Sequence, residues 1–148
     1  MLRSRDGFND GEIVAFHISS NDGASSSILN LADHKKLWPE VHFVGTLNLS
    51  TLSLPSLVEK YRIDLSGYDS LVMDTQGTEL KILQGAKAIL PRFKFIQTEV
   101  ADFPAYEGGC VLSEMDEFLF ANGYRRIVQW KFARKAGVGS YFEVLYAR

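Results

Sequence analysis

The stretch Tyr68 to Ala86, YDSLVMDTQGTELKILQGA, decides the fold of this chain. Residues 71–73 form a short apolar run without alternation, which predicts a strand covered on both faces, as in a parallel α/β sheet. Asp74 ends the run, and Gly77 allows a turn. Apolar residues then recur at helical spacing as far as Pro91, and they are Leu80, Ile82, Leu83, Ala86, Ile89 and Leu90. The stretch therefore predicts a strand, an acidic tip, a turn and a helix.

This order places Asp74 and Gln76 at the carboxyl end of a sheet strand, where open α/β sheets bind ligands. Glu99 ends the next predicted strand, residues 93–100, so it is expected beside them in the same cleft. Alternatively, Glu99 is a solvated carboxylate at a strand end without a functional role. Glu79 falls in the first turn of the helix, where a carboxylate is favourable on dipole grounds alone, and a structural role is its simplest interpretation.

Size and charge narrow the class of protein. The 148 residues are expected to form one domain, 1–148, with a formal net charge of −2. Cys110 is the sole cysteine, which excludes an internal disulfide and favours a reducing compartment. No apolar run reaches the roughly 18 residues of a membrane helix. We therefore expect a soluble cytoplasmic protein with no membrane partner. The three histidines lack metal-site spacing, so no metal is expected.

The remaining chain predicts further strands and helices around this unit. Alternation predicts strands over 13–19 and 41–50, and Ser53 with Pro55 predicts the start of a short helix through Tyr61. Ser113 to Asp116 resembles a capping box that starts a helix ending at Asn122-Gly123. Residues 124–130 and 141–146 predict an antiparallel hairpin at a sheet edge. Its basic and aromatic residues suggest RNA superficially, but an exposed hairpin in an acidic protein argues against nucleic acid.

The segment between the first two strands is a short helix or an irregular loop, and propensity alone leaves both open. It contains Asn21-Asp22-Gly23 and the triplet Ser25, Ser26 and Ser27. These groups are candidates for holding a sugar hydroxyl or a phosphate, but on chemistry alone a turn and helix cap is the favoured interpretation. His34, beside the serines, is the histidine to test as a base.

Several motifs in the right order resemble the FkbM-type family of S-adenosylmethionine-dependent methyltransferases. They are Asp74-x-Gln76-Gly77-x-Glu79-Leu80, then Leu83-x-Gly85-Ala86, then Glu99-Val100, and upstream the Ser20 to Leu29 stretch and Thr51-Leu52. The resemblance runs from about Ile13 onward. It implies an α/β fold with a Rossmann-like methyltransferase sheet, helices on its faces and the C-terminal hairpin. It also implies O-methylation of a sugar or another hydroxylated metabolite.

The resemblance puts Asp74 beside the methyl donor, and chemistry and position suggest the roles of the other candidate residues. Asp74 becomes the base near the acceptor hydroxyl, with capping of the following helix as its alternative; Glu99 and His34 are further catalytic candidates. The candidates for substrate binding are Asn21, Ser25, Ser26, Ser27, Gln76 and Glu79.

The sequence departs from the family in its opening. Such enzymes begin with a strand, a glycine-rich turn for the cofactor and a second strand ending in an acid. Nothing before Ile13 supplies these elements, so the cofactor-binding residues stay unassigned. The strand before Asp74 would then be an open edge, which predicts a homodimer or a separate chain that completes the sheet.

Three functions follow. The first is a methyltransferase that acquires its cofactor half elsewhere, and the second is a non-catalytic remnant or accessory module of the same fold. The third is a fragment of a longer enzyme. The absent glycine-rich turn favours the second for this chain in isolation, and the retained acidic motifs favour the first.

Overall fold

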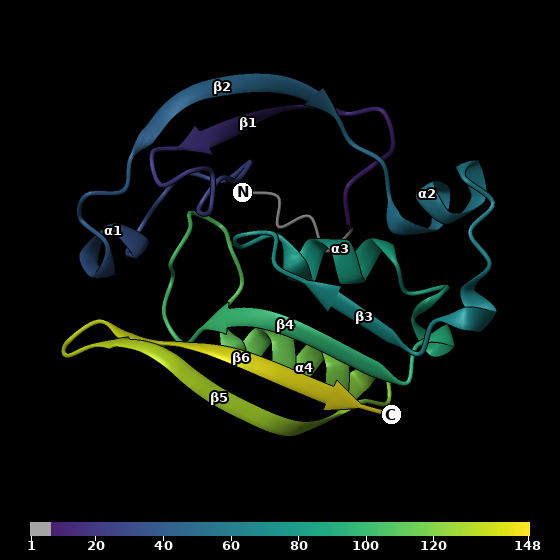
Figure 1. Ribbon diagram of the computed structural model, residues 1–148. Coiled ribbons are helices and arrows are strands. Elements are labelled where there is room, and N and C mark those ends of the chain that lie inside the picture. Colours follow the sequence, from purple (N-terminus) through teal and green to yellow (C-terminus); the bar gives the residue numbers. More distant parts are fainter. Residues whose placement is uncertain (1–6) are drawn as a thin grey trace.

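The computed structural model describes residues 7–148, and it holds two separate sheets (Figure 1). The smaller sheet pairs β1 (Ile13–Ser19) with β2 (Phe43–Ser50) in antiparallel fashion. The larger sheet has the order β3-β4-β6-β5, made of Ser70–Met73, Phe95–Ala101, Gly139–Ala147 and Arg125–Lys135. Its β3–β4 pair is parallel, and its other two pairs are antiparallel. The fold is therefore mixed α/β with a mixed sheet, as the sequence predicts.

Four short helices accompany the sheets: α1 (His34–Leu37), α2 (Leu54–Lys60), α3 (Glu79–Gly85) and α4 (Leu112–Ala121), with 3-10 turns at Leu65–Gly67 and Leu90–Arg92. Helix α1 settles the alternative left open for the first connection, because it is one helical turn inside an otherwise irregular loop. The predicted cap of α2 is confirmed, since the Ser53 hydroxyl accepts the N–H of Ser56 at 3.4 Å. No helix among the described residues is long and apolar enough to cross a membrane.

The main core lies between α3, α4 and one face of the larger sheet. The apolar stripe predicted for α3 is confirmed, since Leu83, Ala86 and Leu90 are all buried. They meet side chains of the sheet and of α4, namely Ile96, Val144, Met115 and Leu119. We call this side of the sheet the covered face.

A second apolar cluster joins the segment between β1 and β2 to the end of β4. Leu31 and Val41 pack there with Phe103, Tyr106 and Tyr141. Backbone bonds run from the N–H groups of Ala32 and His34 to the carbonyl of Ala105, at 2.9 and 3.1 Å. These contacts hold the first connection against the loop that follows β4.

The prediction that residues 71–73 are covered on both faces is wrong. Val72 is 64% exposed, whereas Met73 is 6% exposed. Val72 of β3 pairs with Gln97 of β4. Glu99, two residues further along β4 and on the same side of the sheet, pairs with Glu143 of β6. Glu143 in turn pairs with Trp130 of β5. We call the side carrying these five residues the open face, because Val72 and Trp130 are exposed on it, although the loop after β4 partly buries Glu99. As predicted, β3 lies at an edge of the sheet.

Several boundaries differ from the prediction. Helix α3 ends at Gly85 rather than running to Pro91, and a 3-10 turn completes the connection. Helix α4 begins at Leu112, where the Glu114 carboxylate accepts the N–H of Val111 at 3.0 Å, so the box predicted from Ser113 to Asp116 is wrong. The C-terminal hairpin is confirmed, but its strands extend to Lys135 and from Gly139.

Candidate functional site

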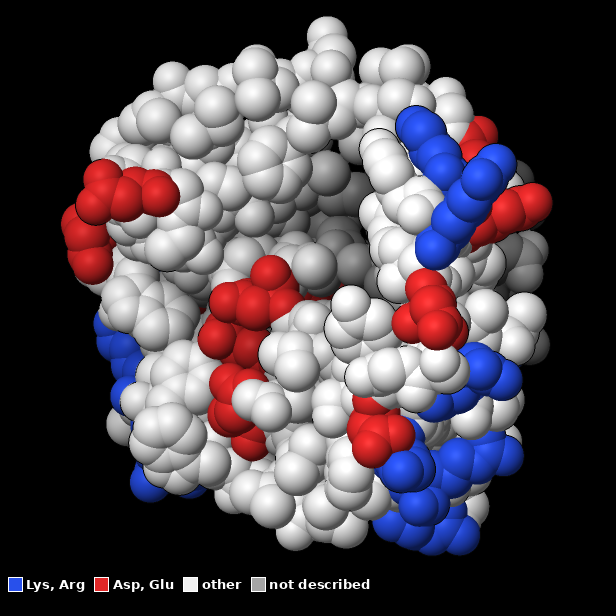
Figure 2. All heavy atoms as spheres, turned by 45° about the vertical axis from the view of Figure 1, so that its right-hand side comes forward, with Lys and Arg blue, Asp and Glu red and all other residues white. Residues whose placement is uncertain are grey.

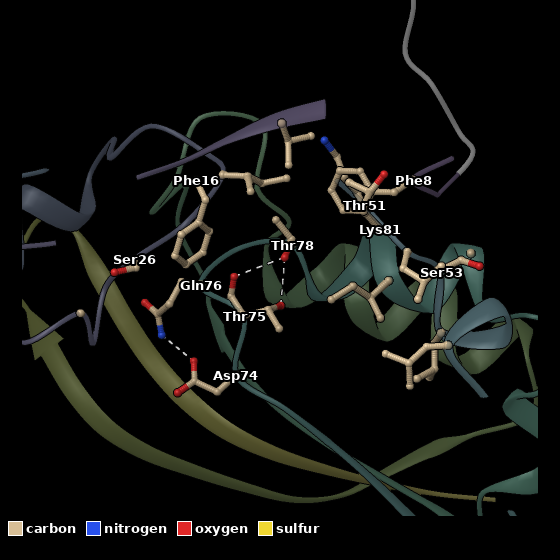
Figure 3. Close-up of a pocket in the computed structure, with 18 of the residues that line it drawn as sticks. Phe8, Phe16, Ser26, Thr51, Ser53, Asp74, Thr75, Gln76, Thr78 and Lys81 are labelled. Atoms are coloured by element: carbon tan, nitrogen blue, oxygen red, sulfur yellow. Dashed lines mark hydrogen bonds between the residues drawn. The ribbon is translucent and has the colours of Figure 1, made fainter. Parts of the chain in front are cut away.

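A cavity of about 560 Å³ lies between the smaller sheet, α2, α3 and the turn after β3. Figure 2 shows a hollow in the surface with acidic side chains gathered beside it. In Figure 3, Asp74, Gln76 and Ser26 lie on one side of the cavity, and Phe8, Thr51 and Lys81 lie on the other. The walls come from β1, α2, α3 and the segment with Ser25, Ser26 and Ser27, which we call the serine loop. Their apolar members include Val14, Phe16, Ile28, Leu52, Leu54, Leu57 and Ile82.

Asp74 follows β3 directly and lines this cavity, as the strand-end prediction requires. Its Oδ1 accepts a hydrogen bond from Gln76 Nε2 at 2.5 Å. Gln76 is itself fixed twice more, since its Oε1 accepts from the Tyr106 hydroxyl at 2.6 Å and its carbonyl from Ser27 Oγ at 2.8 Å. The Asp74 carboxylate is therefore oriented by a side chain that Tyr106 holds at its other amide atom, on a backbone that Ser27 holds.

The turn between β3 and α3 is built around Glu79. Its buried carboxylate accepts the N–H groups of Thr75 at 2.8 Å and Gly77 at 3.0 Å. Burial raises the pKa of Glu79, although these backbone bonds act in the opposite direction. Gly77 has φ +101°, and a Cβ there would lie 3.0 Å from the Tyr106 ring, so the turn requires glycine. Glu79 does not line the large cavity, and its contacts are those of a turn-forming residue.

Glu99 lies near Asp74 but lines a second, much smaller cavity with Tyr106 and Cys110. Burial raises the pKa of Glu99 to about 7, and the negative charges of Asp74, Glu143 and Glu79 add to the shift. The carboxylates of Asp74, Glu79 and Glu143 are thus close enough to Glu99 to interact with it. Their proximity agrees with the prediction that Asp74 and Glu99 share one end of the sheet.

The serine loop mostly bonds to itself. The Ser25 hydroxyl lies 3.2 Å from His34 Nε2 and accepts from Asn21 Nδ2 at 3.0 Å. Ser26 Oγ accepts the N–H of Ser19 at 3.0 Å. Of Asn21 and the three serines, Ser26 alone is among the residues that line the large cavity. These contacts are those of the turn that chemistry alone favoured.

His34 is 3% exposed and packs against the tilted rings of Trp38 and Tyr106, with ring centres 4.8 and 5.4 Å away. Burial lowers its pKa, which keeps the imidazole neutral. Its Nδ1 has no partner among the described residues. The structure thus places His34 in the second core cluster, away from the large cavity.

Sequence reasoning missed several residues of this site. Phe8 falls in the polar lead-in, and Tyr106 falls in a loop without periodicity. Phe16 and Leu57 carried a signal, since both lie on the apolar face of a predicted element, but that pattern indicates core packing and not a cavity wall. Their role depends on how the smaller sheet lies over α3, which local sequence does not encode.

The described residues do not fit the methionine-binding part of S-adenosylmethionine. A cradle of that kind presents free backbone N–H groups from a glycine-rich turn. Here the N–H of Gly23 donates to Ser19 O, that of Gly77 to Glu79, and that of Gly109 to Tyr106 O. In the part of the chain that the structure covers, no group of three or more His, Cys, Asp or Glu side chains is arranged to hold a metal ion.

Comparison with known proteins gives a family for the chain. The family model described as the methyltransferase FkbM domain matches residues 6–126. The chain is also 32% identical over 101 residues to the 2-O-methyltransferase NoeI of Sinorhizobium fredii. That match covers 64% of this chain and 41% of NoeI, so the chain spans less than half the length of this relative. No solved structure matches the chain. On the extent of the family match, the chain belongs to the FkbM methyltransferase family.

Proposed function

We propose that this chain is the acceptor-binding part of an S-adenosylmethionine-dependent O-methyltransferase. Its substrate is a small molecule with a hydroxyl group, and Asp74 takes the proton of that hydroxyl. One observation carries the proposal: a carboxylate at the end of β3, oriented by Gln76, lines a cavity of about 560 Å³. NoeI is named a 2-O-methyltransferase, which supports oxygen as the accepting atom.

Asp74 suits the role of base better than the other candidates. It is exposed at the strand end, and among residues 7–148 its Oδ2 has no hydrogen-bond partner, so it is free to accept a proton. Glu99 faces the smaller cavity, and His34 is buried in a core cluster. We assign these two residues to shaping the charge and the packing near the site.

The methyl donor supplies the methyl group when it is bound, but the described residues lack a cradle for it. We therefore propose that donor binding requires residues from another polypeptide. In this proposal the larger sheet is part of a Rossmann-like methyltransferase sheet, because β3 is parallel to β4 and ends in the acid of the site.

The alternative is a non-catalytic binding module of the same fold. The internal use of the Gly23, Gly77 and Gly109 N–H groups favours it. A module of this kind keeps the cavity and binds a ligand without reacting with it. The two functions differ in whether Asp74 is needed for transfer of a methyl group.

An assay in an extract of the source organism distinguishes the two functions, because the extract supplies both methyl acceptors and other polypeptides. Purified chain is added with S-adenosylmethionine labelled on the methyl group, and label in small molecules is measured. We expect more label with the natural chain than with Asp74→Asn, and a matched Asp22→Asn variant controls for loss of charge on an exposed turn outside the cavity. Equal labelling by the natural chain and Asp74→Asn would reject the methyltransferase proposal.

We also propose that two copies of the chain pair through the open edges of β3. The edge is bordered by the exposed Val72, and antiparallel pairing about a twofold axis keeps the two Asp74 carboxylates at opposite ends of the joined strands. Parallel pairing would place these like charges side by side.

Size-exclusion chromatography with light scattering tests the dimer at micromolar concentration. We expect a dimer for the natural chain and a monomer for Val72→Lys, because a lysine on the edge strand opposes pairing. Val44→Lys, on the equally exposed outer side of β2, is the matched control and should leave the dimer intact. A monomeric natural chain would rule the pairing out.

A further inference from the structure

The large cavity offers very few free polar groups to a ligand. Each hydroxyl side chain in its lining already has a partner within the protein, and these are Ser26, Thr51, Ser53, Thr75 and Thr78. The two ends of the Gln76 amide are bonded to Asp74 and Tyr106. Asp74 Oδ2 is therefore the side-chain oxygen on this side of the cavity that has no hydrogen-bond partner among the described residues.

The rest of the lining is mostly hydrocarbon. Val14 and Phe16 come from β1, Leu54 and Leu57 from α2, and Ile82 from α3. In Figure 3 the Phe16 ring points toward Gln76, so apolar surface begins directly beside the polar end. Lys81 lies on the far side, with its Nζ 5.4 Å from the centre of the Phe8 ring.

This distribution discriminates between classes of hydroxylated ligand. A free sugar carries several hydroxyl groups, and each one buried against hydrocarbon without a partner costs binding free energy. A ligand with an apolar body and a hydroxyl at one end loses nothing in this way, because the body contacts the walls and the hydroxyl reaches Asp74. The volume of about 560 Å³ also suits a ligand with such a body.

We propose that the cavity binds an amphiphilic alcohol, in which an apolar group is attached to the hydroxylated part, and that it selects such a ligand over the bare hydroxylated part. The role of Asp74 as base rests on the proposed methyltransferase function. The selection of an apolar body rests on the lining alone.

Two sugars that differ only in their apolar group test this selection. Octyl β-D-glucoside, below its micelle-forming concentration, and methyl β-D-glucoside are titrated into the purified chain by isothermal calorimetry. We expect the octyl compound to bind at least about tenfold more tightly, because its extra methylene groups leave water. Equal affinities, or no detectable binding of either sugar, would overturn the proposal.

Substitutions inside and outside the large cavity test whether the octyl compound binds there. Leu57→Trp fills the cavity and should weaken the octyl compound at least tenfold, while Val44→Trp, on the outer side of β2, should change it less than twofold. If circular dichroism shows that Leu57→Trp is unfolded, Leu52→Trp replaces it, because Leu52 lines the cavity but is 39% exposed. Octyl binding that a folded cavity variant leaves unchanged means adsorption elsewhere and overturns the proposal.

No methyl donor is present in this experiment, so its outcome is separable from the proposed function. Absent methyl transfer with retained octyl selectivity would reject the enzyme and keep the binding site. Methyl transfer without octyl selectivity would keep the enzyme and reject the amphiphilic ligand.

Discussion

The two faces of the larger sheet use the same strands for different purposes. On the covered face, Ile96, Thr98 and Val144 are completely buried against α3 and α4. On the open face, the alternate residues Gln97, Glu99 and Glu143 are polar, and Val72 and Trp130 are exposed. A strand that alternates in this way places its stabilising contacts on one side and leaves the other available for charge and for contact with other molecules.

The largest effect is expected on the covered face. Ile96→Ala should lower the free energy of unfolding by about 2–5 kcal/mol, because it leaves a cavity in the main core. Urea denaturation followed by circular dichroism measures it. Val72→Ala, one register position away on the open face, should cost less than about 0.5 kcal/mol. Similar losses for both variants would show that the open face is covered in solution.

A smaller effect is expected from the acidic group of the open face. Because the pKa of Glu99 is raised from 4.5 to about 7, folding is opposed by its ionisation. The folded chain binds more protons than the unfolded chain between these values, so stability falls as pH rises from about 4.5 to about 7. Glu99→Gln removes this loss and should stabilise the protein at pH 8 by on the order of 2 kcal/mol, a value discounted because solvent reaches and screens the partly exposed carboxylate.

The same variant should give almost no gain near pH 4, where Glu99 is largely protonated in both states. Urea denaturation at the two pH values measures the difference, and Glu117→Gln on the exposed side of α4 is the matched control. A gain of equal size at both pH values would mean that something other than ionisation of Glu99 is responsible.

The smallest effect is expected at the far edge of the open face. Trp130 is 66% exposed, so Trp130→Ser should change the free energy of unfolding by no more than about 0.5 kcal/mol. Thermal unfolding of the two proteins at one concentration provides the measurement. A loss of 2 kcal/mol or more would indicate that Trp130 is buried in solution, for example between two copies of the chain.

The local pattern of apolar residues predicted most helices and strands, but it did not predict which faces of the sheet are covered. The alternation of Val14 and Phe16 and the stripe of Leu83 and Leu90 follow from periodicity, and the structure confirms both elements. The unbroken run at 71–73 suggested cover on both sides. Val72 is nevertheless exposed, because cover depends on which elements from elsewhere in the chain lie over that face.

The candidate site was predictable only where a strand end determines it. Asp74 and Gln76 follow β3, and the carboxyl ends of strands in open α/β sheets are common ligand positions whatever the side chains elsewhere in the fold. Tyr106 holds Gln76 from 30 residues away in a loop, so neither spacing nor periodicity indicates it. His34 looked available beside polar neighbours, yet packing with Trp38 and Tyr106 buries it.

Titration of S-adenosylhomocysteine into the purified chain is the most direct test of the central claim that the acceptor side of a methyltransferase is present here without a donor cradle. Isothermal calorimetry should detect no binding up to millimolar concentrations, because the N–H groups of Gly23, Gly77 and Gly109 are bonded internally. A dissociation constant in the micromolar range would contradict the account and place the donor site within this chain.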